Sequence, residues 1–358
     1  MVGIALYTGE RRTTEWIGCK DFHRSIAAVG PRNSWGWVFG LPVLVPSDNP
    51  AWCRRLPFQP GPDCIGPDMS DQPLSIVVRT LNAAPQFREL RAGLRLEPCD
   101  ELIVVDSGST DGTPDIARAA GATVVTLAKE RFTYGRSLNV GFAVARNPWI
   151  LALSSHVVPV RADFLDVYRQ GIRRFPANVV AAAGPLVRSD GERGMTGGIT
   201  LYEGADFLKG FEFGAGNPNC LYRRDVWQAR PFDEELGGGE DCEWYVWAIV
   251  AGHALAAVHA AEVYYRFKRS WSAFVYKGRI DYQVTHRYLE VHQPKLSGLA
   301  IRGAKLGLYA AMGRVGWSDV KASMGHCWGS YLEARATRTK GIPGGQLARE
   351  LRAAKLES

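Results

Sequence analysis

Two aspartates stand in the short polar stretch Asp106-Ser107-Gly108-Ser109-Thr110-Asp111-Gly112, whose residue types suit ligand binding. Asp106 directly follows the apolar run 102–105, and small hydroxyl and glycine residues surround it. A carboxylate at the end of a buried strand can accept hydrogen bonds from a nucleobase or a ribose, and small neighbours leave room for the ligand. The same carboxylates can also cap a turn without binding anything. The stretch alone leaves both interpretations open.

The elements around this stretch should place Asp106 at the edge of a sheet. Residues 102–105 are predicted to form a buried strand, a helix should begin at Pro114 and stop at Gly121, and residues 123–127 should form a second strand. This order favours a parallel sheet, whose ligands bind at the carboxyl ends of the strands. The same patterns predict further strands at 74–78, 149–153, 179–183 and 254–258, and helices at 87–96, 163–175 and 240–251. The sequence therefore predicts an α/β fold.

The composition is that of a globular protein rather than a fibrous or disordered one. The chain has 358 residues, of which 46% are hydrophobic and 22% charged, so it can bury a substantial core. Its seven cysteines contain no Cys-x-x-Cys pair, which argues against a disulfide framework and against a zinc site. No apolar run near the start is long enough to span a bilayer. We therefore expect a cytoplasmic protein.

The chain divides by composition into three predicted parts. Residues 1–70 hold eight of the 20 prolines without helical or strand periodicity, so we expect irregular or disordered chain there. The functional domain is expected to begin near Met69, with the preceding residues disordered or foreign to the native protein. Residues 71–294 should form the α/β domain. Residues 295–358 carry eleven Lys or Arg against four Asp or Glu and are predicted to form a helical, basic extension.

An apolar stripe in the basic extension suits an amphipathic helix. Its residues recur at steps of three to four, with one double step across Gly316: Tyr309, Met312, Val320, Met324, Trp328 and Tyr331. Lys305, Arg314 and Lys321 lie on or beside its polar side. Such a helix could dock on an anionic membrane, pack against the α/β domain or expose a solvated charged face. Nucleic-acid binding through this basic extension is a further, less favoured possibility, and no nucleic-acid partner is expected.

Four segments, in their order and spacing, resemble family 2 glycosyltransferases of the GT-A fold. They are residues 75–82, 103–113, 135–141 and 238–241, and the resemblance spans roughly residues 73–290. It implies a mixed, mostly parallel sheet flanked by helices, like that of the bacterial sugar transferases that build polysaccharides. It also implies a nucleotide-diphosphate sugar as donor, inverting hexosyl or deoxyhexosyl transfer, and a glycan or lipid-linked acceptor. Work on such acceptors would bring the protein to the inner face of a membrane.

The resemblance also assigns roles to particular residues. The expected nucleotide-binding residues are Thr80, Asn82, Asp106, Ser109, Arg136 and Asn139. Asp241 falls at the position of the general base, and Glu240 would orient the acceptor or the base. Without the resemblance, the pair would be two carboxylates favoured at a helix N-terminus, and Arg136 a surface residue.

The sequence departs from the family pattern at the residues that usually bind a divalent cation. The family usually places an Asp-x-Asp, or a single Asp, after the fourth core strand to hold a divalent cation on the donor diphosphate. This chain has Ser154-Ser155-His156 there, and Tyr265 where many members have a histidine. His156 is a weak candidate metal ligand, so the use of Mg²⁺ or Mn²⁺ stays open. Arg266 and Lys268 are predicted to share or take over the metal's role at the diphosphate.

Two other functions fit the fold less well. A nucleotidyltransferase should carry a glycine-rich, basic loop directly after the first strand, and residues 81–85 lack one. A sugar-nucleotide-binding module that has lost catalysis would explain the missing metal residues. The intact Glu240-Asp241 pair argues against this second alternative.

Overall fold

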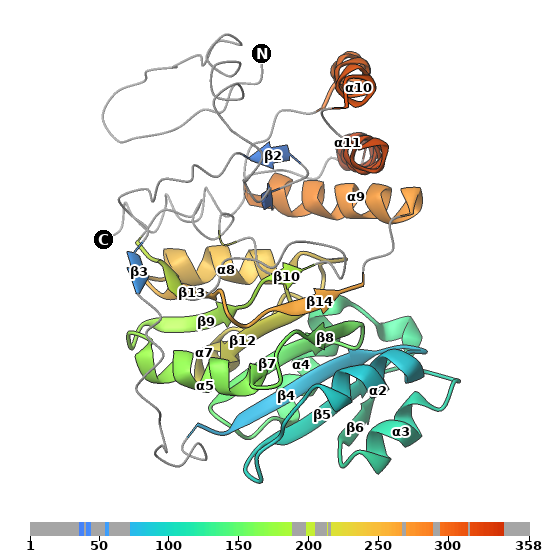
Figure 1. Ribbon diagram of the computed structural model, residues 1–358. Helices are drawn as coiled ribbons and strands as arrows, with labels where there is room; N and C mark the ends of the chain where they lie inside the picture. The colour runs from blue at the N-terminus through green and yellow to red at the C-terminus, as the bar shows by residue number, and fades with distance from the viewer. Residues whose placement is uncertain are drawn as a thin grey trace.

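A nine-stranded sheet forms the centre of the computed structural model, which describes residues 36–38, 41–43, 54–56, 72–187, 198–204, 213, 216–266, 270–288, 294–313 and 316–339 (Figure 1). Its strands follow the order β3 (Arg54–Leu56), β11 (Ile199–Tyr202), β13 (Ala254–Val258), β9 (Val179–Ala183), β12 (Asn219–Arg223), β7 (Trp149–Ser154), β4 (Leu74–Thr80), β5 (Glu101–Asp106) and β6 (Thr123–Thr126). Strands β7, β4, β5 and β6 run parallel, whereas β12 is antiparallel to both of its neighbours. The predicted mixed α/β sheet is confirmed.

Helices cover both faces of this sheet. On one face lie α2 (Ala84–Ala92), α3 (Thr113–Ala119) and α5 (Phe164–Arg174), and on the other α4 (Tyr134–Val144), α7 (Arg224–Ala229) and α8 (Glu240–Val250). Along β4, Ile76 and Val78 enter one core while Val77 enters the other. Because both faces are buried, the strand has a continuous apolar sequence rather than an alternating one.

Two glycines of helix α4 allow close contact, one with the sheet and one with the loop before α8. A Cβ added to Gly141 would lie 2.5 Å from Val77 Cγ1 and 2.8 Å from Val105 Cγ2. A Cβ added to Gly135 would lie 2.5 Å from the Asp233 carbonyl oxygen. Segment 135–141 therefore fits between the sheet and the loop that precedes α8.

Two smaller sheets accompany the central one. The first consists of β10 (Leu186–Val187), β14 (Val263–Tyr265) and β8 (Val157–Pro159), and it lies directly after the carboxyl end of β7. The second pairs β1 (Gly36–Val38) with β2 (Leu41–Val43). A short 3₁₀ helix at Lys129–Arg131 precedes α4.

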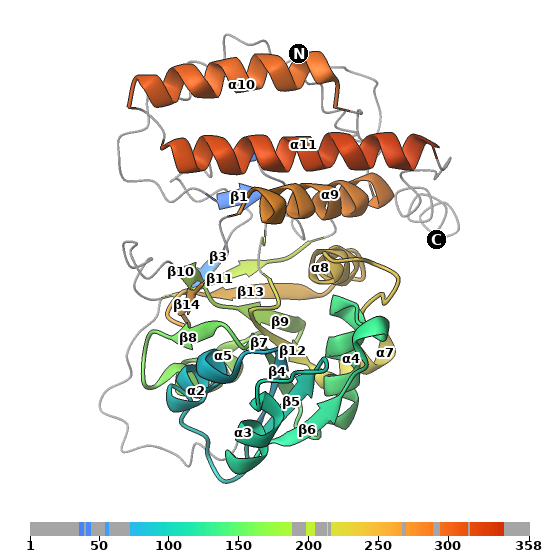
Figure 2. The same cartoon turned by 90° about the vertical axis from the view of Figure 1, so that its right-hand side faces the viewer.

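The C-terminal helices α9 (Trp271–Tyr288), α10 (Leu296–Ala311) and α11 (Trp317–Thr339) stack beyond α8 (Figure 2). Glycines bring α9 and α11 together, since a Cβ on Gly278 would lie 1.9 Å from His326 O. The prediction of one amphipathic helix over residues 309–331 is wrong, because the apolar stripe is divided between α10 and α11. The face of α11 that meets α9 is polar instead; its buried residues include Ser323, His326, Glu333 and Thr337.

Several other predictions fall in segments that the structure describes only in part. Residues 184–218, expected to be a mobile glycine-rich loop, include the strands β10 and β11, and residues 188–197, 205–212 and 214–215 lie outside the described residues. Apart from β1, β2 and β3, residues 1–70 also lie outside them, so their predicted irregularity stays a prediction. Among the described helices, none combines the length and the apolar character needed to cross a bilayer.

Candidate active site

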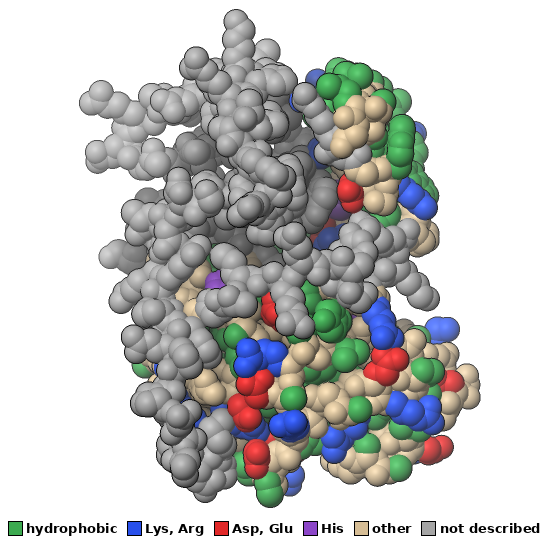
Figure 3. Space-filling view, viewed as in Figure 1, with side chains coloured by type: hydrophobic (Ala, Val, Ile, Leu, Met, Phe, Trp, Pro, Cys, Tyr) green, Lys and Arg blue, Asp and Glu red, His purple; other side chains and the backbone are tan. Residues whose placement is uncertain are grey.

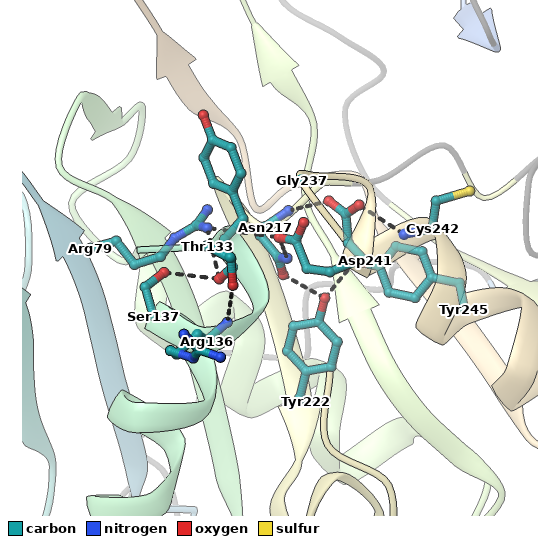
Figure 4. Close-up of polar contacts among 12 residues, drawn as sticks. Arg79, Thr133, Arg136, Ser137, Asn217, Tyr222, Gly237, Asp241, Cys242 and Tyr245 are labelled. Carbon is teal, nitrogen blue, oxygen red and sulfur yellow. Dashed lines mark hydrogen bonds and ion pairs between the residues drawn. The ribbon is translucent and has the colours of Figure 1, made fainter. Parts of the chain in front are cut away.

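Glu240 and Asp241 begin helix α8 at the carboxyl edge of the central sheet. The residue before them, Gly239, has φ +76°, a left-handed conformation that favours glycine. Asn217 holds both carboxylates, since its Nδ2 donates to Glu240 Oε1 at 2.7 Å and its backbone N–H to Asp241 Oδ2 at 3.1 Å. Figure 4 shows Asn217 between Arg79 and Asp241. Asp241 is only half-buried, so of the two it is the one that a substrate can reach.

A buried chain of hydrogen bonds fixes Asn217 from behind. Tyr222 donates its hydroxyl hydrogen to Asn217 Oδ1 at 2.7 Å, and the hydroxyl oxygens of Tyr222 and Tyr245 are also 2.7 Å apart. Tyr245 in turn contacts Cys220 Sγ at 3.1 Å. Burial raises the pKa of both tyrosines well above the usual value, so they remain neutral hydrogen-bond donors. The amide is therefore held rigidly under the carboxylate pair.

Glu240 is the buried member of the pair, and its protonation is shifted accordingly. Burial, followed by the negative charge of Asp241, raises the pKa of Glu240 to about 7. Arg79 acts in the opposite direction, with its Nη1 3.7 Å from Glu240 Oε1. A carboxyl that titrates near neutrality next to a second carboxylate is typical of catalytic sites.

The two loops predicted to hold the nucleotide are tied to each other. Asp106 accepts hydrogen bonds from the backbone N–H groups of Gly108 and Ser109, as well as from the Ser109 hydroxyl. Asn82, with φ +47°, accepts from the Thr110 N–H at 2.8 Å, and its own N–H donates to Ser109 Oγ at 2.8 Å. The Asp106 carboxylate thus caps its own turn, and Asn82 and Ser109 bridge the loops after β4 and β5.

Thr80 differs from its neighbours because its hydroxyl is free. Within the described part of the chain, its buried Oγ1 has no hydrogen-bond partner. Thr80 also pairs with Asp106 in the β4–β5 register, and the preceding residue is Arg79, which reaches Glu240. Asp106 and the Glu240–Asp241 pair therefore lie along the same edge of the sheet, on the same side of the domain.

Arg136 and Asn139 converge on a residue that the sequence did not single out, Glu234. Arg136 Nε donates to Glu234 Oε2 at 2.6 Å and Asn139 Nδ2 to Glu234 Oε1 at 3.0 Å. Asn139 also bonds the backbone of Phe232 through both ends of its amide. Arg136 is only partly buried, whereas the Asn139 amide is fully engaged within the protein. Here Asn139 fixes the loop before α8, and both residues are only partly buried.

The residues in place of the family's metal ligands do not form a cation site. His156 packs against Tyr265, with ring centroids 5.1 Å apart. Burial and then the positive charge of Arg79 lower the pKa of His156, so its ring is neutral at pH 7. Among the described residues, no three His, Cys, Asp or Glu side chains come together to hold a metal ion. One imidazole beside a guanidinium does not suit Mg²⁺ or Mn²⁺, which prefer several oxygen ligands.

Arg266 and Lys268 are the two residues predicted to bind the diphosphate, and the structure describes only Arg266. The Arg266 N–H donates to His156 O at 3.4 Å, which places its backbone beside the site. Its side chain is about half exposed and pairs with Glu89 Oε2 at 2.7 Å. Lys268 lies outside the described residues.

Helix α9 supports the turn that carries the carboxylate pair. The Tyr276 hydroxyl donates to Gly237 O at 3.1 Å. A Cβ on Gly238 would lie 2.7 Å from Ile280 Cδ1, and one on Gly239 2.5 Å from Val284 Cγ2. Gly238 and Gly239 are thus needed for close packing against α9. Neither this contact nor Asn217 was predicted, because each depends on partners distant in the sequence.

Comparison with known proteins agrees with this arrangement. The family model described as glycosyl transferase family 2 matches residues 75–228. The mannosyltransferase PcManGT from Pyrobaculum calidifontis, solved with GDP-Man and Mn²⁺, has a TM-score of 0.53 at 14% identity, over 76% of this chain and 91% of that one. The comparison with curated protein sequences found no match.

Two other solved structures are less similar. TarS 1–349 from S. aureus has a TM-score of 0.45 at 16% identity, over 75% of this chain and 92% of that one. Glucosyl-3-phosphoglycerate synthase from Mycobacterium tuberculosis, with Mn²⁺, UDP and glucosyl-3-phosphoglycerate, has a TM-score of 0.40 at 18% identity, over 55% of this chain and 73% of that one. Residues 75–228 thus match glycosyl transferase family 2, and the chain shares the GT-A fold with the mannosyltransferase.

Proposed function

We propose that the protein is an inverting glycosyltransferase that moves a sugar from a nucleotide-diphosphate donor to an acceptor hydroxyl. The observation that supports this proposal is that Asn217 hydrogen-bonds both Glu240 and Asp241. The pair lies along the same sheet edge as the loop that contains Asp106. A single in-line displacement needs a general base that is held in place and accessible to the acceptor, and Asp241 is fixed and only half-buried.

In this mechanism Asp241 takes the proton of the acceptor hydroxyl while the oxygen attacks the anomeric carbon. The bond from that carbon to the diphosphate breaks, and its electron pair leaves with the phosphate oxygen. Glu240, buried and close to neutral, orients the acceptor or Asp241 without adding a full negative charge. Thr80 offers its free hydroxyl to the nucleotide. Asp106 already accepts three hydrogen bonds from its own turn, which leaves its carboxylate less capacity for a base or a ribose.

The other predicted site residues support the nucleotide loops or would contact the diphosphate. Asn82 and Ser109 shape the nucleotide loops, and Asn139 holds Glu234 beside Arg136. Arg266 and Lys268 would approach the diphosphate from the edge of β14, and Arg266 would leave Glu89 to do so. The similar mannosyltransferase was solved with Mn²⁺. The residues around His156 do not fit such an ion, so no step is assigned to a metal.

For the acceptor we propose a glycan or a lipid-linked sugar in surface polysaccharide synthesis, with hexosyl or deoxyhexosyl transfer at the inner face of a membrane. The outer side of α10 supports a membrane location. The exposed apolar residues of this helix are Leu296, Ile301 and Leu308, with Met312 at its C-cap, each between 52% and 70% exposed. Figure 3 shows hydrophobic side chains on this part of the surface. Residues 295–314 contain two lysines and two arginines but neither aspartate nor glutamate. An apolar face on a basic helix suits an anionic lipid surface.

A nucleotide screen followed by turnover tests the proposed function. Thermal stabilisation of the protein by UDP-, GDP-, CDP- and dTDP-sugars identifies the donor, because a ligand that binds the folded state raises the melting temperature. Slow hydrolysis of that donor should fall about 10²- to 10⁴-fold in Asp241→Asn, since a general base contributes that much. Asp115→Asn, on an exposed turn of α3, is the matched control. Stabilisation with no hydrolysis by the wild type would instead indicate a non-catalytic sugar-nucleotide-binding module.

A further inference from the structure

Arg79 is a buried charge at the centre of the site. It lies near the end of β4, and only 11% of its side chain is exposed. Removing a guanidinium from water is costly unless its charge is paired and its N–H groups are hydrogen-bonded. A buried arginine in a stable fold should therefore have close, well-aligned anionic partners.

The partners that Arg79 has are poor ones. Its Nη1 lies 3.7 Å from Glu240 Oε1 and 3.5 Å from the Tyr134 carbonyl oxygen, both beyond a good hydrogen-bond length. Its Nε is buried and has no hydrogen-bond partner among the described residues. The guanidinium carbon lies 5.3 Å from the centroid of the Tyr134 ring, which orients the group without satisfying its donors. Most of its hydrogen-bonding capacity is thus unused.

The position of this guanidinium coincides with the missing metal site. Arg79 pairs with Ser154 in the β4–β7 register, and its carbonyl accepts from the Ser155 N–H at 3.2 Å. Its charge acts on His156 and on Tyr265, the two positions where the family resemblance leads one to expect metal ligands. A cation bound to His156 would be repelled by the guanidinium. The donor set therefore fits an anion.

We propose that Arg79 binds the diphosphate of the donor and stabilises its departure, at the place where other members of the family are expected to use a divalent cation. The inference rests on the proposed function. Arg79 would donate two parallel hydrogen bonds to phosphate oxygens, a geometry that a guanidinium supplies well. It transfers no proton. The electron pair of the breaking carbon–oxygen bond goes to the leaving diphosphate, and the acceptor proton goes to Asp241.

The test is the preference of the protein for diphosphates over monophosphates in EDTA. UDP, UMP, GDP and GMP serve as probes, with dissociation constants measured by titration calorimetry. The wild type is expected to bind one diphosphate at least about tenfold more tightly than its monophosphate without any metal. Arg79→Met should lose that preference and keep the monophosphate affinity. Arg161→Met, which removes an exposed arginine paired with Asp163, should keep both.

Two results would overturn the inference. One is a diphosphate preference that disappears in EDTA and returns with Mn²⁺ in the wild type. The other is an unchanged preference in Arg79→Met or, if that variant does not fold, in Arg79→Gln, which keeps polar donors but removes the charge. If no nucleotide binds the wild type at all, the proposed function fails and the inference falls with it. Nucleotide binding with a wrong diphosphate dependence refutes the role of Arg79 alone.

Discussion

Glu240 gives the site a pH dependence whose direction can be worked out from its environment. Its pKa rises from 4.5 in the unfolded chain to about 7 in the folded one, mainly through burial. Below pH 4.5 the group is protonated in both states and costs nothing. As pH rises from 4.5 to 7 the unfolded chain ionises first, so stability falls, and the loss is complete above pH 7. It amounts to about 3 kcal/mol.

The turnover number kcat should also depend on the protonation of Glu240. We expect kcat to fall as pH rises through about 7, because an ionised Glu240 adds a second negative charge beside Asp241 and next to a leaving diphosphate. Glu240→Gln mimics the neutral state, so the alkaline decline should disappear and stability at pH 8 should rise. Rate profiles and urea unfolding at pH 5 and pH 8 measure both effects. An alkaline decline that persists in Glu240→Gln would assign it to another group.

Two buried tyrosines, Tyr222 and Tyr168, allow the effect of positioning the carboxylate pair to be measured apart from the effect on stability. Tyr222 bonds Asn217, which holds the carboxylates, whereas Tyr168 bonds Asn219 at 2.8 Å, which holds the Ala261 carbonyl instead. Both hydroxyls are buried, so Tyr222→Phe and Tyr168→Phe should each cost about 1–3 kcal/mol of stability. Only Tyr222→Phe should also lower kcat, on the order of tenfold, or about 1.4 kcal/mol of barrier. Equal kcat values in both variants would show that Asn217 needs no such support.

At the scale of elements, the strands with continuous apolar runs were predictable from the sequence, whereas strand β12 was not. Strands β4, β5, β7, β9 and β13 lie within two residues of their predicted ranges, because burial on both faces gives each a continuous apolar run. Strand β12 was missed because it starts at Asn219, after a glycine-rich stretch, and joins the sheet antiparallel between β9 and β7. Its place depends on neighbours rather than on its own pattern.

The candidate site shows the same limit. Glu240 and Asp241 could be proposed from the resemblance of their segment. The residues that hold them could not, because Asn217 is fixed by Tyr222 and Tyr245, and Arg136 meets a partner 98 residues away, Glu234. Arg79 stood in the sequence beside the expected nucleotide residues, yet its unsatisfied burial is a property of the fold.

Helix α9 belongs to the site because it packs on the turn before α8. Gly239→Ala would place a Cβ 2.5 Å from Val284 Cγ2 and also strain a left-handed φ. Gly252→Ala, at the other end of α8, strains a similar φ of +86° but meets nothing within 4 Å. Both should lose about 1 kcal/mol of stability from backbone strain. Gly239→Ala should in addition lower kcat at least tenfold, in a steady-state assay with the identified donor, because the turn must shift.

At the scale of the whole molecule, the positive charge and the exposed apolar surface meet on α10. The net charge of the chain is +7. On α10, Ile301 and Leu308 are 70% and 60% exposed, so they can enter a bilayer surface without disturbing the site.

Binding to vesicles should therefore depend on both features. The double variant Ile301→Asp and Leu308→Asp is expected to lose cosedimentation with phosphatidylglycerol vesicles, and added salt should weaken binding of the wild type. Val144→Asp, an exposed apolar residue at the end of α4, should bind like the wild type. Retained binding in the double variant would exclude α10 as the docking face.

The contact between α9 and the glycine turn also bears on the order in which activity arises during synthesis. The nucleotide loops are complete once β5 has paired with β4, and the tie between Asn82 and Thr110 needs nothing later in the chain. The base becomes fixed only after α9, through residue 288, has left the ribosome and closed over residues 237–239. A growing chain therefore forms the turns of the nucleotide loops before it can fix the carboxylate pair.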